Sequence, residues 1–306
     1  MRENPRTHGP ERLVSICIAS IGRPSLRDTV DAALACALPP GLAREIVIAD
    51  DSRTDAVAVA LGGLIGRDGV RVVASGARNI SFARNRAMAE ATGEYLVFVD
   101  DDEVPTGDWL EQLVRQAEES GADGVQGRVI GVYPRHAPAW ARKLRPYDKT
   151  YGAAGQAIPV GSTCNLLLRR AALRERVLEF DPALGRSGGE DTDLCFRLTA
   201  SGGRIVCSTT ATVYEHVPTE RLERRHLLRR YARGGHSYAS TVLAHTGAPR
   251  RALEIAKAAA LVAAFSVMAA AAWAVVPAAS MRFALRTSGN VGKLLFFIGR
   301  PAWNLY

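Results

Sequence analysis

The sequence of 306 residues is poor in cysteine, in aromatic residues and, toward its C-terminal end, in acidic residues. Its five cysteines are odd in number and form no Cys-x-x-Cys pair, which argues against a disulfide framework and against a zinc ribbon. A reducing compartment is the simplest environment for such a chain. Residues 1–12 are polar and lack the apolar stretch of a signal peptide, so we expect a polar tail followed by a cytoplasmic domain.

The shortage of acidic residues is confined to the C-terminal part of the chain. Residues 221–306 contain 13 Lys and Arg but only 2 Asp and Glu, whereas residues 1–220 contain 26 and 29. The formal net charge of +8 therefore comes entirely from the segment that flanks the longest apolar run. This distribution favours an anionic membrane surface as a partner and argues against nucleic acid.

That apolar run, residues 258–280, has no charge over 23 residues and is long enough to span a bilayer. The alternative is a buried helix or a helix of an amphipathic bundle. Basic residues in 221–257 place the preceding domain on the cytoplasmic face, but four more cations follow the run. A single span would export those four, so the segment either enters and returns or lies in the interface, with residues 293–303 as a second shallow contact. We therefore expect a basic helical juxtamembrane segment at 221–257 and a membrane-associated region at 258–306.

Residues 13–220 have the pattern of an α/β domain. Short runs rich in Val, Ile and Leu at 13–20, 45–52 and 94–103, with a weaker run at 70–75, predict buried parallel strands. Helix-like stretches at 25–38 and 81–91 lie between them, and further helices are expected at 191–200 and 221–233. The alternation predicts a mostly parallel sheet flanked by helices, with ligands bound beyond the carboxyl ends of its strands.

Acidic residues collect at those strand ends. The run "VDDDE" contains four consecutive carboxylates, Asp100 to Glu103, directly after an apolar strand. Such a cluster is costly unless a cation or strong donors neutralise it, and hard oxygen ligands at a strand end suit Mg²⁺ or Mn²⁺. A solvated turn that caps the next helix would explain the same triplet. Further acids in "IADDS" and "GGEDTD" would meet it at one sheet edge, and this favours a site over the capping alternative.

Five segments, in order, carry a resemblance to a known family. The segments "VSICIAS…RPSL", "IVIADDSRTD", "ISFARNRAMAEATGEYLVFVDDDEVP", "GGEDTDLCFRL" and "VYEHVPTERL" resemble the successive signatures of family 2 glycosyltransferases with the GT-A fold. The later segments and the membrane-like tail are most similar to bacterial succinoglycan-type exopolysaccharide glucosyltransferases. The match spans residues 13–222. It departs at "ASIGR", where the family usually has an aromatic residue, and this leaves the nucleotide unspecified.

The resemblance implies a role for each matching residue. On the donor side, Ser20 and Asp50 would contact the nucleoside, Arg84 the diphosphate, and Asp100 and Asp102 would form the D-x-D pair, with Asp101 also on the donor side. On the acceptor side, Asp191 would be the general base and Glu190 an acid that binds the acceptor. His216 would supply a further contact to the metal or the diphosphate. Asp102 is expected to be the direct metal ligand. For His216, an ordinary structural histidine is an equal alternative.

The resemblance implies an inverting enzyme of the cytoplasmic face of the bacterial inner membrane. It would move a sugar from a nucleotide-diphospho-sugar to a glycan acceptor, expected to be linked to polyprenyl diphosphate, with Mn²⁺ or Mg²⁺ as cofactor. One base and one metal site serve a single displacement, and no second carboxylate is identifiable as a nucleophile. Two alternatives remain: a haloacid-dehalogenase-type phosphatase, because "VDDDEV" fits its D-x-D-x-V motif, and an inactive membrane-anchored scaffold.

Overall fold

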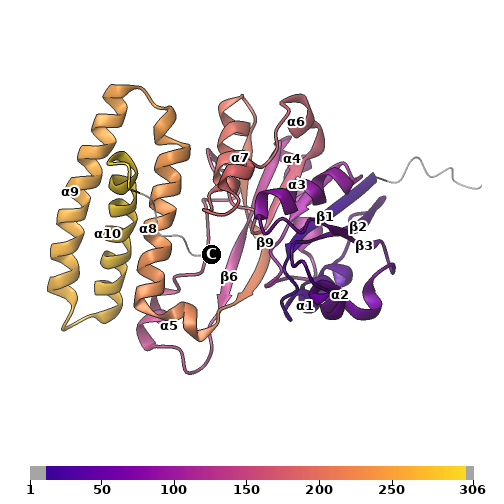
Figure 1. The fold of residues 1–306 in the computed structure, drawn as a ribbon, viewed down its shortest axis with the longest axis horizontal. Coiled ribbons are helices and arrows are strands. Elements are labelled where there is room, and N and C mark those ends of the chain that lie inside the picture. Colours follow the sequence, from indigo (N-terminus) through magenta and orange to yellow (C-terminus); the bar gives the residue numbers. More distant parts are fainter. Residues whose placement is uncertain (1–11, 301–306) are drawn as a thin grey trace, which may run out of the picture.

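The computed structural model describes residues 12–300, which form a sheet with helices on both faces and a separate layer of C-terminal helices (Figure 1). Residues 1–11 of the expected polar tail and residues 301–303 of the expected second membrane contact lie outside the described residues.

A nine-stranded sheet forms the centre of the described chain, in the order β3-β2-β1-β4-β8-β6-β9-β5, with β7 paired to β9. The strands are β1 (Arg12–Ser20), β2 (Leu42–Asp50), β3 (Val70–Ala74), β4 (Tyr95–Phe98), β5 (Glu103–Pro105), β6 (Gly124–Val132), β7 (Ala157–Ile158), β8 (Leu166–Arg169) and β9 (Ile205–His216).

The first four strands are parallel, as the apolar runs predict, and their carboxyl ends meet at one edge. Beyond β4 the sheet is mixed, because β8 runs antiparallel to both of its neighbours while β6 and β9 run parallel to each other. The expected strand at 94–103 is two strands, since the chain turns at Asp100–Asp102 and β5 leaves β4 to pair with β9.

Helices cover both faces of the sheet. One face packs against α1 (Leu26–Ala35), α2 (Ala56–Leu61) and α4 (Trp109–Ser120), with Trp109 fully buried in the core. The other face packs against α3 (Ile80–Glu90), α6 (Arg170–Glu175) and α7 (Glu190–Ala200). Successive residues along each strand point alternately into these two cores, as expected for a buried sheet.

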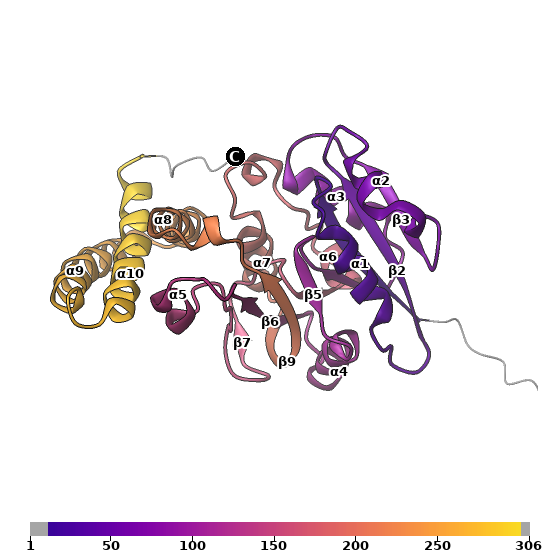
Figure 2. The same cartoon turned by 90° about the horizontal axis from the view of Figure 1, so that it is seen from below.

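The C-terminal helices form a layer at one side of the sheet (Figures 1 and 2). They are α8 (Arg224–Thr241), α9 (Ala248–Ala272) and α10 (Pro277–Phe297), and the short α5 (Ala139–Leu144) lies at their base. A third apolar cluster joins Met281 and Leu285 of α10 to Leu227 of α8 and to the buried Tyr147. The expected basic segment at 221–257 thus covers α8 and the first part of α9.

The uncharged run at 258–280 is not one helix. It ends α9, turns at residues 273–276 and begins α10, with Pro277 at the first position of the new helix. The two helices run antiparallel and form a helical hairpin (Figure 1). One helix of the described chain, α9, is long and apolar enough to cross a membrane, and only 6% of its most apolar 18 residues is buried. The buried-helix alternative for residues 258–272 is therefore not supported.

Candidate active site

The acidic turn between β4 and β5 is held by internal hydrogen bonds. The carboxylate of Glu103, itself buried, accepts a hydrogen bond from the backbone N–H of Asp100 (3.0 Å). The middle acid, Asp101, is buried and points toward β1, where it accepts a hydrogen bond from the Ser20 hydroxyl (2.6 Å) and pairs with Arg23 (3.0 Å). Burial raises the pKa of Asp101 to about 6 although Arg23 opposes the shift. Asp101 therefore anchors the turn to the end of β1.

Arg84 joins this turn to a second acidic cluster. The guanidinium of Arg84, on α3, lies 3.0 Å from the carboxylate of Asp100 and forms an ion pair with Glu190 at the start of α7. The arginine side chain is buried and also lies over the ring of Phe180. Burial alone would lower the pKa of Arg84, but Glu190 and Asp100 raise it above its usual value. Two acidic motifs that are far apart in the sequence thus meet through one buried cation.

The second cluster lies at the N-terminus of α7. Gly189 precedes the helix with a φ of +99°, a conformation that favours glycine, and a Cβ there would approach the Cβ of Ser237 to 2.8 Å. Glu190 is buried, and both its burial and the adjacent Asp191 raise its pKa. Asp191 is partly exposed and accepts a hydrogen bond from the N–H of Thr192 (2.7 Å). Of the two carboxylates, that of Asp191 is therefore the more accessible.

Asp102 is surrounded by cations. Its carboxylate lies 3.0 Å from Arg23, which follows β1, and 3.2 Å from Arg221, which follows β9. Arg221 also pairs with Glu215 at 3.1 Å, and burial raises the pKa of Glu215. Part of the positive charge that the acidic turn requires therefore comes from the protein itself, from the arginines that follow β1 and β9.

The carboxylates of the site suit a divalent cation. Three buried carboxylate oxygens have no hydrogen-bond partner within the described residues, and they belong to Glu103, Glu190 and Glu215. No group of three or more His, Cys, Asp or Glu in residues 12–300 is already arranged as a metal cage. Because Mg²⁺ and Mn²⁺ bind through one or two carboxylates and complete their shells with water and phosphate, the turn fits such an ion without a complete cage.

The predicted nucleoside contacts differ in accessibility. Ser20 is buried and its hydroxyl is engaged by Asp101, while Asp50 at the end of β2 is partly exposed and accepts a hydrogen bond from the N–H of Ser52 (2.8 Å). The adjacent Asp51 is buried and accepts hydrogen bonds from the N–H groups of Ala77, Arg78 and Asn79, at 2.7–2.9 Å. Asp51 thus fixes the loop that leads into α3 and so positions Arg84.

His216 is not brought into the cluster by any contact. It ends β9, it is exposed, and its side chain makes no hydrogen bond or ion pair within the described chain. Its neighbour Glu215 faces Glu103 across the β5–β9 pair. The predicted role of His216 in metal or diphosphate binding stays a prediction.

Sequence reasoning missed four residues that shape the site: Arg23, Glu215, Arg221 and Lys149. Lys149 is close to Glu215 (3.9 Å) and contacts the Cys164 thiol (3.1 Å). Burial alone would lower the pKa of Lys149, but Cys164, Glu215 and Glu103 raise it. Arg23, Glu215 and Arg221 lie inside segments that carry the resemblance, so the signal was present, whereas nothing near Lys149 in the sequence marks it.

Known proteins resemble this chain over nearly its full length. The model of glycosyl transferase family 2 matches residues 15–177. The succinoglycan biosynthesis protein ExoM of Rhizobium meliloti (strain 1021) is 33% identical over 290 residues, which cover 94% of this chain and 93% of that protein. The O-antigen biosynthesis protein RfbC of Myxococcus xanthus is 31% identical over 162 residues, covering 47% of this chain and 12% of that protein.

Two solved structures share the fold. The mannosyltransferase PcManGT from Pyrobaculum calidifontis, in complex with GDP-Man and Mn²⁺, has a TM-score of 0.66 at 20% identity and covers 94% of this chain and 87% of that one. TarS 1–349 of S. aureus in complex with UDP has a TM-score of 0.53 at 15% identity, with 94% and 92% covered. The fold is thus GT-A, as expected, and on the family model and the match to ExoM the chain belongs to glycosyltransferase family 2.

Proposed function

We propose that this transferase moves a sugar, with inversion, from a nucleotide-diphospho-sugar to a lipid-linked glycan during exopolysaccharide or cell-surface polysaccharide synthesis. The observation that carries the proposal is the buried Arg84, which links the D-x-D turn at Asp100 to the acids that begin α7. A donor bound at the first would have its reacting carbon directed to the second. The similarity to ExoM supports the polysaccharide assignment, and the GDP-Man and Mn²⁺ of PcManGT support the class of donor and metal.

Asp102 and Asp100 would hold Mn²⁺ or Mg²⁺ on the donor side. When bound, such an ion neutralises the charge that develops on the leaving diphosphate. The chain's own cations assist, because Arg84 and Arg221 already approach these carboxylates and can turn toward phosphate oxygens when the ion takes their place.

Asp191 would remove the proton from the acceptor hydroxyl, and Glu190 would bind the acceptor beside it. Asp191 suits this role because its carboxylate is partly exposed at the N-terminus of α7. Glu190 is held by Arg84 and so has a fixed position. A single base on the acceptor side corresponds to one displacement and to inversion at the sugar.

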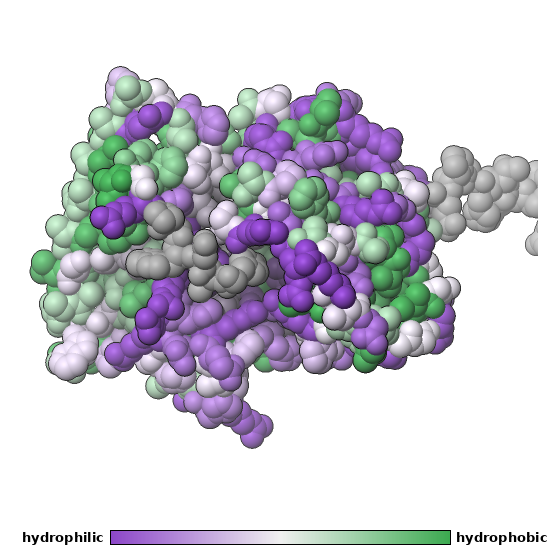
Figure 3. All heavy atoms as spheres, in the orientation of Figure 1, coloured by the Kyte–Doolittle hydropathy of each residue, from purple (hydrophilic) through white to green (hydrophobic). Residues whose placement is uncertain are grey.

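The C-terminal helices would bring the enzyme to the cytoplasmic face of the bacterial inner membrane. Large apolar side chains on α9 and the following turn are exposed, among them Leu253 (65%), Val267 (70%) and Trp273 (69%). Figure 3 shows hydrophobic residues gathered over this helical layer, and polar residues over most of the rest of that face. Because α9 and α10 are antiparallel, Lys293 near the end of α10 lies at the same end of the hairpin as the basic first turn of α9. This arrangement is in keeping with a hairpin that would enter a membrane from one side.

The test of the donor site is a thermal-shift panel of UDP-, GDP- and dTDP-sugars with the full-length chain in mild detergent, with and without Mn²⁺. A ligand that binds only the folded state raises its stability by mass action. We expect one nucleotide class to raise the melting temperature only when Mn²⁺ is present, and that donor then to be hydrolysed or transferred. If no nucleotide-sugar binds under any condition, the inactive-scaffold alternative holds instead. The phosphatase alternative conflicts with the family assignment and with the motif's location after the fourth strand.

The test of the membrane assignment is flotation with vesicles of anionic and of zwitterionic lipid. We expect the full-length chain to float with anionic vesicles and to remain bound at high salt through its apolar surface. Behaviour as a soluble monomer without detergent and without vesicle binding would contradict the assignment.

A further inference from the structure

Arg221 connects the acidic turn to the layer of C-terminal helices. It lies in the short turn Thr219–Leu222, between the end of β9 and the start of α8. Its guanidinium donates hydrogen bonds to Asp102 (3.2 Å) and Glu215 (3.1 Å), and 28% of its side chain is exposed. Leu222, the next residue, is buried in the third apolar cluster. The backbone of Arg221 therefore belongs to the layer, while its side chain belongs to the candidate active site.

Tyr147 holds the backbone of Arg221 from within the layer. The ring of Tyr147 is fully buried in the third apolar cluster, and its hydroxyl donates a hydrogen bond to the carbonyl of Arg221 (3.0 Å). Its own N–H donates to the hydroxyl of Tyr133 (2.8 Å), so its backbone is held as well. A buried phenol hydroxyl requires a hydrogen-bond partner, and the carbonyl of Arg221 is that partner. One hydrogen bond thus links the interior of the layer to the residue that contacts Asp102.

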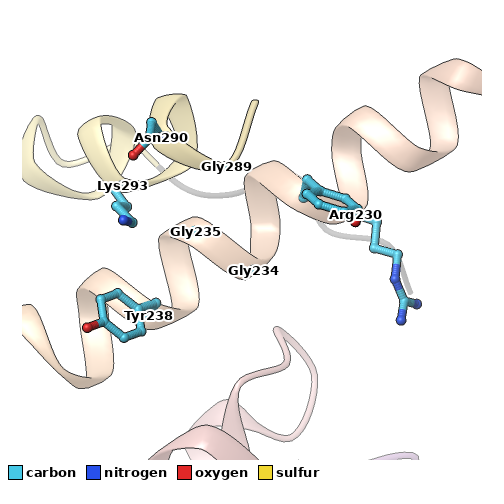
Figure 4. A pocket seen from close by; sticks show the side chains of 8 residues that line it. Arg230, Gly234, Gly235, Tyr238, Gly289, Asn290 and Lys293 are labelled. Carbon is cyan, nitrogen blue, oxygen red and sulfur yellow. The ribbon is translucent and has the colours of Figure 1, made fainter. Parts of the chain in front are cut away.

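Helices α8 and α10 in turn fix the ring of Tyr147. The guanidinium carbon of Arg230, on α8, lies 4.7 Å from the centre of this ring. Figure 4 shows that Arg230 extends from α8 away from Lys293 and from the groove between α8 and α10. A cation over a ring face favours one placement of the ring. Leu227 of α8 and Leu285 of α10 are buried in the same cluster as the ring, so both helices enclose it.

We infer that Tyr147 is a positioning residue for donor binding, because its hydroxyl holds Arg221 where the guanidinium can pass from Asp102 to the diphosphate of the donor. The hydrogen bond restrains the backbone of Arg221 and leaves its side chain able to move. The inference deepens the proposed function and rests on it, since the proposed function already has Arg221 turn toward phosphate oxygens. It adds that the C-terminal layer, besides its proposed attachment to a membrane, supports the donor site.

The test measures the affinity of the full-length chain in detergent for UDP, GDP and dTDP, each with Mn²⁺, by titration calorimetry. The nucleotide that binds the wild type is then used with Tyr147→Phe, which removes the hydroxyl and keeps the ring. We expect its Kd to rise about fivefold, within the range for loss of one hydrogen bond. The Kd of Arg221→Gln should rise about tenfold. In the double variant, Tyr147→Phe should add no further loss, because it acts through Arg221.

Tyr231→Phe is the matched control. Tyr231 lies on α8 and is partly buried against the third apolar cluster, and within residues 12–300 its hydroxyl makes no hydrogen bond. The Kd of this variant should equal that of the wild type. An unchanged Kd in Tyr147→Phe would overturn the inference. A fivefold loss that persists when Arg221 is already Gln would overturn it as well, because a merely structural role of Tyr147 predicts additive losses.

Hydrogen exchange of the ligand-free chain gives a second measurement, which requires neither metal nor nucleotide. Residues 219–223 should exchange faster in Tyr147→Phe than in the wild type and in Tyr231→Phe, because the carbonyl of Arg221 has lost its donor. Equal exchange in all three proteins would overturn the inference. If the wild type binds none of the three nucleotides, the proposed function fails instead, and hydrogen exchange still shows whether Tyr147 holds Arg221.

Discussion

Arg84 and Glu190 form an ion pair in which both side chains are more than nine-tenths buried. The same guanidinium also binds Asp100, so removing it leaves two carboxylates close together without a counter-charge. Breaking a buried pair by removing one partner costs about 3–5 kcal/mol. Stability and activity should therefore both depend on this residue.

Arg84→Met should lower the free energy of unfolding by about 3 kcal/mol and reduce kcat/KM at least a hundredfold. Urea unfolding and an initial-rate assay measure the two effects. Arg86→Met is the control, because Arg86 lies on the same helix, is half exposed and pairs with Glu90, and it should cost less than about 1 kcal/mol. Similar losses in both variants would remove the special role of Arg84.

Asp102→Asn should abolish Mn²⁺-dependent transfer while the protein stays folded. The amide is a poor ligand for a hard cation, and its neutral charge relieves the repulsion within the acidic turn. Titration of activity and melting temperature with Mn²⁺ checks both parts. Asp31→Asn, an exposed acid on α1, serves as control. Wild-type turnover in Asp102→Asn would exclude this residue as the metal ligand.

Asp191→Asn should retain the affinity for the donor and lose about 10²–10⁴ in kcat, because a general base acts in the chemical step alone. Asp193→Asn provides the comparison two residues along α7, where the carboxylate pairs with Arg197 and should affect stability more than rate. If Asp191→Asn weakens donor binding as strongly as it lowers kcat, the residue belongs to the donor site.

Asp101→Asn should become more stable relative to wild type as the pH rises from 4 to 7. The folded pKa of Asp101 is about 6, above the value near 4 expected in the unfolded chain. The folded state of the wild type then binds more protons than its unfolded state in this range. Its free energy of unfolding therefore falls by up to about 3 kcal/mol as the pH rises, and that of the uncharged variant does not. Melting temperatures of the two proteins from pH 4 to 7 measure this difference. A constant difference across the range would contradict the raised pKa.

Gly235→Ala should destabilise the helical layer, whereas Gly234→Ala should be neutral or stabilise it. A Cβ at Gly235 would lie 1.8 Å from the carbonyl oxygen of Gly289 on α10, while one at Gly234 would meet nothing within 4 Å. Alanine is favoured over glycine within a helix by about 1 kcal/mol. Thermal unfolding of the two neighbouring variants compares close packing with helix propensity directly. Equal stability of both would mean that α8 and α10 are not in close contact.

The parallel half of the sheet and the acidic strand ends could be predicted from the sequence because each depends on a short, continuous pattern. Buried strands such as β2 require runs of apolar residues, and the carboxylates follow them directly. The contacts of Arg221 could not be predicted in this way. Its place at the start of the basic C-terminal part of the chain gives no sign that its side chain pairs with Asp102, 119 residues away.

The turn at residues 273–276 that separates α9 from α10 could not be predicted from composition either, because the residues just before and after it are uncharged and rich in alanine. Pro277 was the only local signal. A proline is favoured at the first position of a helix but distorts a helix when it lies in the interior. Pro277 was therefore compatible both with one long distorted helix and with the start of a second helix. Packing of α10 against Leu227 and Tyr147 decides between them, and this packing depends on residues far away in the chain.

The pairing of β5 with β9 has a consequence for the order in which the active site forms during synthesis of the chain. The strand at Glu103–Pro105 is made early but has no hydrogen-bonded neighbour until Val213–Glu215 has left the ribosome. The first four strands can form before that point, as N-terminal parts generally do. The acidic turn is then completed only when about two thirds of the chain exists, shortly before the helices of the C-terminal layer follow. A nascent chain would thus complete the acidic turn at nearly the same moment as it acquires the helices that we propose bind a membrane.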